Sequence, residues 1–318
     1  MGLNNCTAFN EYPHGVLAVD SGYWRERMAA CYLLEDRDEV AIIETGTNSS
    51  VPRLLRVLEQ RGWSRHQVRY VIVTHVHLDH AGGAGALMAA LPQARFLVHP
   101  RGARHMIDPA RLEASVRMVY GDTVFDRDYG TLVPIDAARV SEMNDGEVAQ
   151  LGGRQLLFRD TPGHARHHFC VFDERSHGWF SGDTFGLSYR DTDTARGPLI
   201  FPTTTPVQFD PEALKASIRM LAASEPDCMY LTHYGRVGDV QRLAADMQQW
   251  VDALVDIAQR NREHPRRTEA IQDEMRERLV SAARAHGVEL PGPALRELFE
   301  GDVVLNTQGI EHWLDETA

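Results

Sequence analysis

The sequence predicts a layered α/β fold, because short apolar runs typical of strands alternate with segments of helical periodicity. The expected strands are residues 16–19, 29–34, 40–43 and 96–98. The expected helices are residues 51–61, where Leu54, Leu55 and Leu58 share one face, and residues 84–91. Because expected helices flank the expected strands along the sequence, we expect the helices to pack against the faces of a sheet.

The chain becomes predominantly helical after residue 236. Apolar residues recur at three- and four-residue steps from Val240 to Ala258, which predicts an amphipathic helix. Residues 267–286 form a second expected helix ended by Gly287, and residues 291–299 and 311–314 form two shorter ones. We therefore divide the chain into a main domain at residues 1–236 and a helical extension at residues 237–318, packed on the same domain.

Length, charge and cysteine usage narrow the class of protein. A chain of 318 residues with a net charge of −12 is long enough for a large core and unsuited to bind a phosphate backbone. No apolar run has the length of a membrane span, and residues 1–14 do not resemble a secretory signal. The cysteines, Cys6, Cys31, Cys170 and Cys228, lack metal-binding spacing and are expected to be reduced in a cytoplasmic protein.

The most informative motif is residues 74–80, Thr-His-Val-His-Leu-Asp-His. It follows the apolar run of residues 71–73, so a buried strand is expected to deliver these side chains to a loop. Side chains two apart on an extended segment point the same way, so His75 and His77 can bind one metal ion. Asp79 and His80 follow as the chain turns and are directed to a second position beside the first.

Three further ligand-type residues follow short apolar segments. His164 ends the run Thr-Pro-Gly-His at residues 161–164, Asp183 lies in Phe-Ser-Gly-Asp-Thr at residues 180–184, and His233 lies in Tyr-Leu-Thr-His-Tyr-Gly at residues 230–235. In each case a strand would carry the residue to one edge of a sheet.

Taken together, these motifs resemble, in order, those of the metallo-β-lactamase-fold hydrolases over residues 15–235. The resemblance implies an αβ/βα sandwich of two mixed sheets with outer helices, followed here by the C-terminal helical extension. It also implies that His75, His77 and His164 hold one metal ion, that Asp79, His80 and His233 hold a second, and that Asp183 bridges both. Imidazole and carboxylate ligands suit two divalent ions, with zinc as our first expectation and iron or manganese as alternatives.

The bridging aspartate separates branches of this family. Enzymes that cleave β-lactams generally lack it, and the arrangement around His164, His168 and Asp183 resembles the glyoxalase II-like branch. Two positions depart from that branch: Ala165 stands where threonine is usual, and Glu44 replaces an aspartate that would hold the metal loop rather than a metal. A Lys/Arg-Asn-Asn segment like the one that binds glutathione in glyoxalase II is not found.

The resemblance implies a binuclear hydrolase that attacks a small ester, thioester or lactone with a metal-bridging hydroxide, with Asp79 and Asp183 as the catalytic carboxylates. One alternative is a mononuclear iron persulfide dioxygenase or a phosphodiester hydrolase on the same scaffold. Another is a metal-containing binding module without activity.

Substrate contacts are predicted from position alone. Phe185, Tyr189 and Tyr234 neighbour the ligand loops, and Tyr234 could donate to an oxyanion. Thr204 and Thr205 either orient substrate oxygens or complete a proline-bounded loop. The aromatic residues between 120 and 129 either line the pocket or cover the core. The apolar stripe after residue 236 predicts a homodimer.

Overall fold

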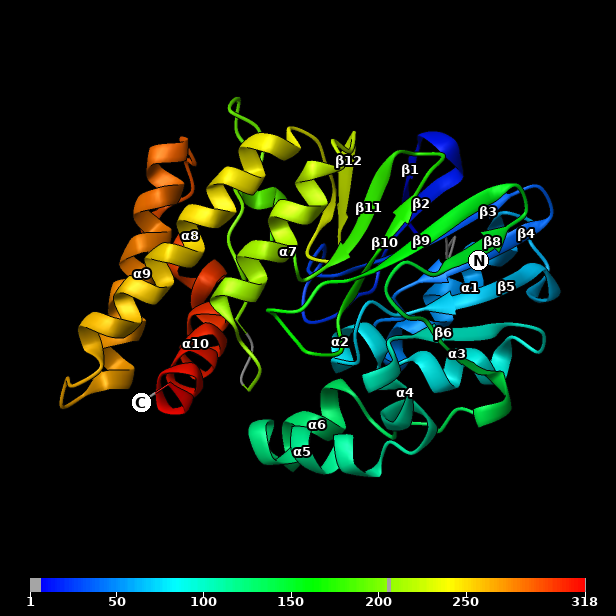
Figure 1. Cartoon of the computed structure of the whole chain (residues 1–318), viewed down its shortest axis with the longest axis horizontal. Coiled ribbons are helices and arrows are strands. Elements are labelled where there is room, and N and C mark those ends of the chain that lie inside the picture. The colour runs from blue at the N-terminus through cyan, green and yellow to red at the C-terminus, as the bar shows by residue number, and fades with distance from the viewer. Residues whose placement is uncertain (1–6, 205–206, 318) are drawn as a thin grey trace, which may run out of the picture.

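In the computed structural model, which describes residues 7–204 and 207–317, two β-sheets pack against each other and helices cover their outer faces (Figure 1). The helical segment after residue 239 lies at one end of the molecule, beside the second sheet (Figure 1). This is the α/β sandwich of two mixed sheets that the sequence analysis predicted.

The first sheet has seven strands arranged in chain order. They are β1 (Phe9–Tyr12), β2 (Val16–Asp20), β3 (Ala30–Asp36), β4 (Glu39–Ile43), β5 (Val68–Ile72), β6 (Arg95–Val98) and β7 (Val140–Glu142). The first four strands pair antiparallel, whereas β4 to β7 run parallel. The parallel strands therefore all end at one edge of the sheet.

The second sheet has six strands. In spatial order they are β13 (Gly235–Val237), β12 (Cys228–Leu231), β11 (Gly178–Gly182), β10 (Phe169–Asp173), β9 (Arg154–Asp160) and β8 (Val148–Leu151). Only β11 and β12 pair in parallel. Consequently the ends of β9, β11 and β12 lie at the same edge of this sheet.

Ten α-helices complete the described part of the chain. They are α1 (Val51–Gln60), α2 (Leu78–Ala81), α3 (Ala84–Ala90), α4 (Pro100–Ile107), α5 (Ala110–Tyr120), α6 (Asp122–Asp128), α7 (Pro211–Ala223), α8 (Val240–Asn261), α9 (Arg267–His286) and α10 (Gly292–Glu316).

Burial on both faces explains why the strands read as continuous apolar runs. On β2, Val16 and Ala18 enter the layer between the two sheets, while Leu17 and Val19 enter the layer under α1 and α3. Similar apolar layers lie between the second sheet and helices α7 and α8, and among helices α8 to α10.

The sequence-based elements differ from the structure mainly near the C-terminus. Residues 291–299 and 311–314 were expected to be two short helices, which is wrong: they belong to the single helix α10. Gly301 interrupts the pattern in sequence, but Phe299, Val303 and Ile310 are buried against neighbouring helices and carry the helix through it. Tertiary packing here outweighs local propensity.

Two other expectations concern the surface and the cysteines. None of the helices in the described ranges combines the length and apolarity that crossing a membrane requires. Cys31, Cys170 and Cys228 are free and buried, and Cys6 lies outside the described residues.

Candidate metal centre

The ligand-type side chains converge where corresponding edges of the two sheets meet. The loop after β5 carries His75 and His77, and the loop between β9 and β10 carries His164. Asp183 directly follows β11, and His233 follows β12. The amide of Phe169 donates to the carbonyl of Thr74 across this junction at 3.0 Å, so the two sheets are joined at the site itself.

The first ligand group consists of three histidines and one aspartate. Nε2 of His75 lies 2.8 Å from Nδ1 of His77, which lies 3.1 Å from Nε2 of His164. Oδ2 of Asp183 is 3.4 Å from Nε2 of His164 and 3.9 Å from Nε2 of His75. These four side chains offer ligand atoms that lie within 4.8 Å of one another.

The second group consists of Asp79, His80 and His233, whose ligand atoms also lie within 4.8 Å of one another. Oδ2 of Asp79 is 3.2 Å from Nε2 of His233 and 3.6 Å from Nε2 of His80. Oδ1 of Asp183 faces this group, at 3.3 Å from His80 and 3.7 Å from His233. Each oxygen of the Asp183 carboxylate therefore faces a different group.

These residues fit two divalent ions. Nε2 of His80 and Oδ1 of Asp183 are buried and have no well-directed hydrogen bond, although the two atoms are 3.3 Å apart. Burial of such atoms without a partner is unfavourable, and a cation between them would satisfy both. The donor set of imidazole and carboxylate is one that zinc, iron and manganese accept, so it leaves the metal open.

The charges within the site differ between the two groups. Burial lowers the pKa of His75 and His77 well below the ordinary value, which keeps these imidazoles neutral. Burial acts the same way on His80, but the carboxylates of Asp183, Asp79 and Glu44 outweigh it and raise its pKa well above the ordinary value. Burial raises the pKa of Asp79, yet His80 and His233 outweigh it and lower the pKa to about 2.

Contacts behind the ligands fix their orientation. Nδ1 of His164 faces the carbonyl of Thr203 at 3.1 Å, and Nδ1 of His233 faces the carbonyl of Met28 at 2.7 Å. A proton on each Nδ1 leaves the lone pair of Nε2 free for a metal. Nδ1 of His80 faces Oε1 of Glu44 at 3.2 Å, so Glu44 has the supporting position expected from the sequence.

His168 contacts Asp183 from beneath. Its Nε2 accepts a hydrogen bond from the amide of Asp183 at 3.2 Å, and its Nδ1 lies 2.9 Å from the hydroxyl of Thr161. Gly182, with φ of 49°, makes this approach possible, because a Cβ there would come within 2.5 Å of His168 Nε2 and 2.4 Å of the Thr74 hydroxyl.

A group of tyrosines lies beside Asp79. The hydroxyls of Tyr23 and Tyr129 are 2.8 Å apart, and the ring of Tyr120 is 6.3 Å from that of Tyr129. Burial, followed in every case by the negative charge of Asp79, raises the pKa of all three phenols. Of the aromatic residues between 120 and 129, Phe125 and Tyr129 are buried in an apolar cluster with Tyr23 and Leu78, and their place in a substrate pocket stays a prediction.

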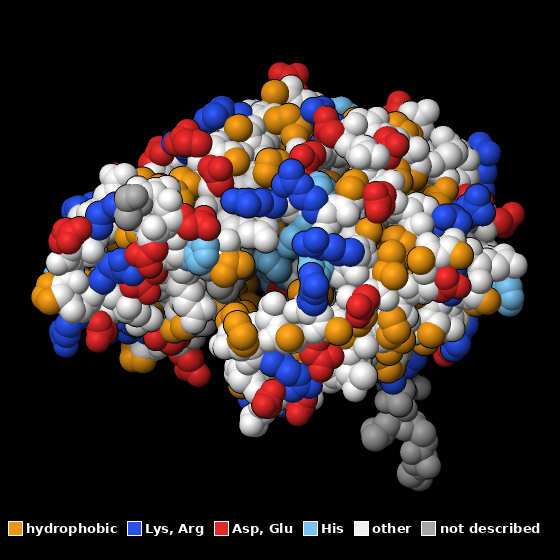
Figure 2. All heavy atoms as spheres, turned by 60° about the horizontal axis from the view of Figure 1, so that its bottom comes forward, with side chains coloured by type: hydrophobic (Ala, Val, Ile, Leu, Met, Phe, Trp, Pro, Cys, Tyr) orange, Lys and Arg blue, Asp and Glu red, His pale blue; other side chains and the backbone are white. Residues whose placement is uncertain are grey.

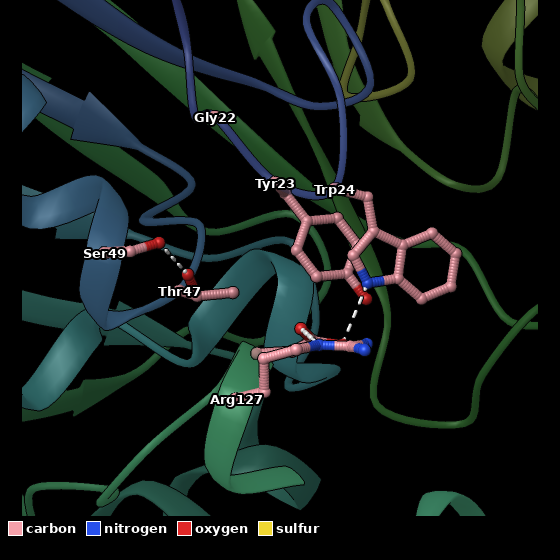
Figure 3. Close-up of a pocket in the computed structure, with 7 residues that line it drawn as sticks. Gly22, Tyr23, Trp24, Thr47, Ser49 and Arg127 are labelled. Atoms are coloured by element: carbon pink, nitrogen blue, oxygen red, sulfur yellow. Dashed lines mark hydrogen bonds and ion pairs between the residues drawn. The ribbon is translucent and has the colours of Figure 1, made fainter. Parts of the chain in front are cut away.

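A cavity of about 410 Å3 opens next to this group (Figure 3). Tyr23 and Trp24 stack at one side of it, with ring centroids 5.0 Å apart. Figure 3 shows Thr47 and Ser49 on another side and Arg127 reaching in from α6. Tyr23 therefore relates the cavity to the candidate metal centre, since Tyr23 lines the cavity and the charge of Asp79 acts on its hydroxyl.

The residues predicted to contact substrate occupy different surroundings. Phe185 is buried under α7 and α8, and Tyr234 lies in the layer between the sheets. The Tyr189 hydroxyl donates to both carboxylate oxygens of Asp302, and the Thr204 hydroxyl donates to the carbonyl of Asn306. Their contribution to substrate binding stays a prediction, and Thr205 lies outside the described residues.

Sequence reasoning assigned no role to two residues at this site. The ring of His167 lies 5.5 Å from that of His77, half-buried at the edge of the first ligand group. Tyr23 was not singled out either. Neither residue belongs to a local sequence motif. Tyr23 in particular meets Tyr129 only because the fold brings two distant segments together.

Comparison with known proteins agrees with this geometry. The model of the metallo-beta-lactamase superfamily matches residues 24–233, and the chain belongs to this superfamily. It is similar to the metallo-beta-lactamase fold-containing protein ST1585 of Sulfurisphaera tokodaii, with 29% identity over 172 residues, 53% of this chain and 61% of that protein. The crystal structure of ST1585 superposes with a TM-score of 0.66 and 22% identity, covering 94% of this chain and 99% of that one.

Two relatives have names that state an activity. Human acyl-coenzyme A thioesterase MBLAC2 is 26% identical over 195 residues, 56% of this chain and 67% of that protein. The hydroxyacylglutathione hydrolase of Rhodopseudomonas palustris is 27% identical over 153 residues, 48% of this chain and 46% of that protein. Both are distant relatives, and the matched region spans only part of each.

Proposed function

We propose that this chain is a binuclear metal-dependent hydrolase of the glyoxalase II-like branch, which cleaves a small thioester, with esters and lactones as related substrates. The observation that carries the proposal is the Asp183 carboxylate, whose two oxygens face two separate ligand groups. A mononuclear iron oxygenase would have no need for the complete second group of Asp79, His80 and His233.

The ligand side chains have distinct tasks in this proposal. His75, His77 and His164 would hold one ion, the second group would hold the other, and Asp183 would set their separation. When bound, two such ions lower the pKa of a water between them toward neutrality and polarise the substrate carbonyl. Asp79 is the more open carboxylate, with a side chain 22% exposed, and stays ionised because its pKa is about 2. It can therefore accept a hydrogen bond from a water while holding its cation.

The tyrosine pair supplies hydrogen-bond donors. Because the pKa values of Tyr23 and Tyr129 are raised, both phenols stay protonated at neutral pH. Only one of the two hydroxyls is the donor in the bond between them, so the other is free to donate to a substrate oxygen near Asp79. Donors directed at a developing oxyanion stabilise acyl-transfer transition states.

Thioesters are favoured over other acyl compounds by the names of the relatives. The human relative is an acyl-coenzyme A thioesterase and the bacterial one a hydroxyacylglutathione hydrolase, and both names describe cleavage of a thioester.

The test is a substrate panel on protein reconstituted separately with zinc, iron and manganese. The panel contains an acetyl thioester, an aryl acetate, a lactone and a phosphodiester. We expect thioester hydrolysis that Asp183→Asn reduces to about 1% or less, a loss of roughly 2.7 kcal/mol or more in transition-state stabilisation. Asp256→Asn, on the exposed face of α8, is the control and should retain activity. Phosphodiester cleavage alone, or oxygen consumption with a persulfide, would contradict the proposal.

A further inference from the structure

Positively charged side chains gather around the opening above the metal centre. Figure 2 shows a hollow in which histidine side chains are visible, with Lys and Arg side chains above it and to its right. Exposed arginines come to this region from three segments: Arg101 and Arg104 on α4, Arg111 on α5, and Arg166 in the loop that holds His164. We call these four arginines the basic rim.

Contacts link the rim to the loops of the site. Nη1 of Arg101 donates to the carbonyl of Arg166 at 3.4 Å, which ties α4 to the loop between β9 and β10. Nε of Arg104 donates to Nε2 of His105 at 3.3 Å. Burial, then the positive charges of Arg104 and Arg111, lower the pKa of His105, so the two guanidinium groups act on the same place.

His167 connects the rim to the ligands. Its ring lies 5.5 Å from that of His77 on one side, and it is close enough to His105 on the other for their charges to interact. Burial, together with His164, His105 and His99, lowers the pKa of His167 to about 3. Arg166 immediately precedes His167 in the loop that carries His164, so the rim lies beside the first ligand group rather than on a remote surface.

The four rim arginines have no carboxylate within ion-pair distance among the residues that the structure describes. A neighbouring, partly buried arginine is paired with carboxylates instead. Arg117, on the same helix as Arg111, pairs with Glu113, Asp122 and Asp126 at 2.7 to 3.1 Å. In a protein with a net charge of −12, four unpaired arginines at one opening are a marked local excess of positive charge.

We propose that the basic rim binds the anionic end of the leaving thiol, so that the substrate is a thioester whose thiol carries phosphate or carboxylate groups. This inference rests on the thioesterase activity proposed above and specifies its substrate class. The scissile bond would lie at the metal centre, while the charged part of the thiol extends past His167 onto the arginines.

Charge and geometry both favour this ligand. Guanidinium groups present paired donors that match phosphate and carboxylate oxygens. The overall negative charge of the protein is screened beyond about 8 Å at physiological salt, so the nearby arginines dominate what an anionic substrate meets at the opening. A neutral thioester would gain nothing from these side chains.

The experiment compares three thioesters with the same acetyl group: acetyl-coenzyme A, which carries phosphates, S-acetylglutathione, which carries carboxylates, and the truncated, neutral S-acetyl-N-acetylcysteamine. Each is tested with the metal-loaded wild type, the charge-reversed Arg101→Glu/Arg104→Glu variant and the control Arg69→Glu. Arg69 is also exposed and without an ion pair in the described chain, but lies at the opposite end of β5 from the metal loop.

We expect the double reversal to lower the ratio of kcat/KM for the preferred anionic thioester to that for the neutral one by about 10-fold or more, as for electrostatically guided binding. Raising NaCl from about 50 to 300 mM should lower the same ratio in wild type and in Arg69→Glu but not in the double variant. Arg69→Glu should match wild type. A loss with acetyl-coenzyme A alone identifies phosphate as the recognised group, and a loss with S-acetylglutathione alone identifies carboxylate. An equal effect on all three thioesters, or no difference from Arg69→Glu, overturns the inference.

A binding measurement separates this inference from the proposed activity. Calorimetric titration with adenosine 3′,5′-bisphosphate and with glutathione disulfide requires no hydrolysis. Weaker binding of either anion by the double variant, at unchanged metal content and circular dichroism, supports the rim even if no thioester is cleaved. Equal binding of both anions by all variants overturns it. If the double variant does not fold, Arg111→Glu on α5 provides the same test from another helix.

Discussion

Replacing Glu44 by glutamine tests how the second ligand group is held in place. Glu44 lies just after β4 and is buried. Its Oε1 accepts from the Thr74 hydroxyl at 2.5 Å, from the Thr232 hydroxyl at 3.3 Å and from His80 Nδ1 at 3.2 Å. Its Oε2 accepts from the Thr74 amide at 3.3 Å. One carboxylate therefore connects the loops after β5 and β12 and orients a ligand.

The expected size of the effect follows from these contacts. Glutamine has one oxygen and one NH2 group, so in either orientation the NH2 meets a donor: Nδ1–H of His80 or the amide of Thr74. The two threonine hydroxyls can rotate to adapt, but the two N–H groups cannot turn away. Moving the proton of His80 from Nδ1 to Nε2 would remove the lone pair that binds the metal, and turning the amide of Thr74 would distort the backbone. A buried hydrogen bond to a charged group contributes about 1.5–3 kcal/mol. We therefore expect about 10- to 100-fold weaker binding of one metal ion, the range found for such supporting residues.

Competition with a chromogenic zinc chelator measures this directly. Wild type should release two equivalents, and Glu44→Gln should release one of them at a chelator concentration about 10- to 100-fold lower. Glu59→Gln, an exposed residue of α1, serves as the control. If Glu44→Gln retains both ions with wild-type affinity, the supporting role argued for this carboxylate is refuted.

Four further predictions concern metal content, catalysis, stability and assembly. Protein purified without chelator should contain about two divalent ions per chain, and metal analysis giving one after supplementation would contradict this. Tyr129→Phe should lower kcat/KM by about 10- to 100-fold through loss of a donor, and an unchanged value would exclude the tyrosine pair from the reaction. Burial raises the pKa of Asp302 from 3.8 to about 7. Because the folded value exceeds the unfolded one, wild type should lose stability as pH rises between these values. In denaturant titrations, the free energy of unfolding of Asp302→Asn should therefore rise relative to that of wild type by up to roughly 4 kcal/mol as the pH increases from 4 to 8. A pH-independent difference would contradict the assignment. The chain is still predicted to be a homodimer, and light scattering at the 35.7 kDa monomer mass would contradict that.

The dimer prediction now has less physical support than its sequence pattern indicated. That prediction rests on the apolar stripe after residue 236, which falls largely on α8. In the structure its members Leu243, Met247, Val251 and Leu254 are buried within the chain, against the second sheet, α7, α9 and α10. A helical pattern reports that a face is covered but does not say whether the same chain or another one covers it.

The ligand loops could be predicted because their signal is local. Each ligand-type residue follows an apolar strand directly, and strand ends at one sheet edge bring such residues together whatever the rest of the chain does. Strands with weaker patterns were not identified from the sequence. β8 and β13 are short, with four and three residues, and β10 is a five-residue strand that ends at the polar Asp173. Their places depend on pairing with neighbours, which a single sequence does not reveal.

Substrate-facing residues are harder to predict than metal ligands for a geometric reason. Adjacency to a ligand places Phe185 and Tyr189 on a site loop, but it does not set the direction of their side chains, and both are buried in apolar layers. Tyr23 and Tyr129 are 106 positions apart in sequence, yet their hydroxyls are 2.8 Å apart and the charge of Asp79 acts on both. The basic rim is likewise assembled from α4, α5 and the loop of His164. Metal ligands must satisfy one ion at short range and so leave compact motifs, whereas a substrate surface spans many elements and becomes visible only once they are folded together.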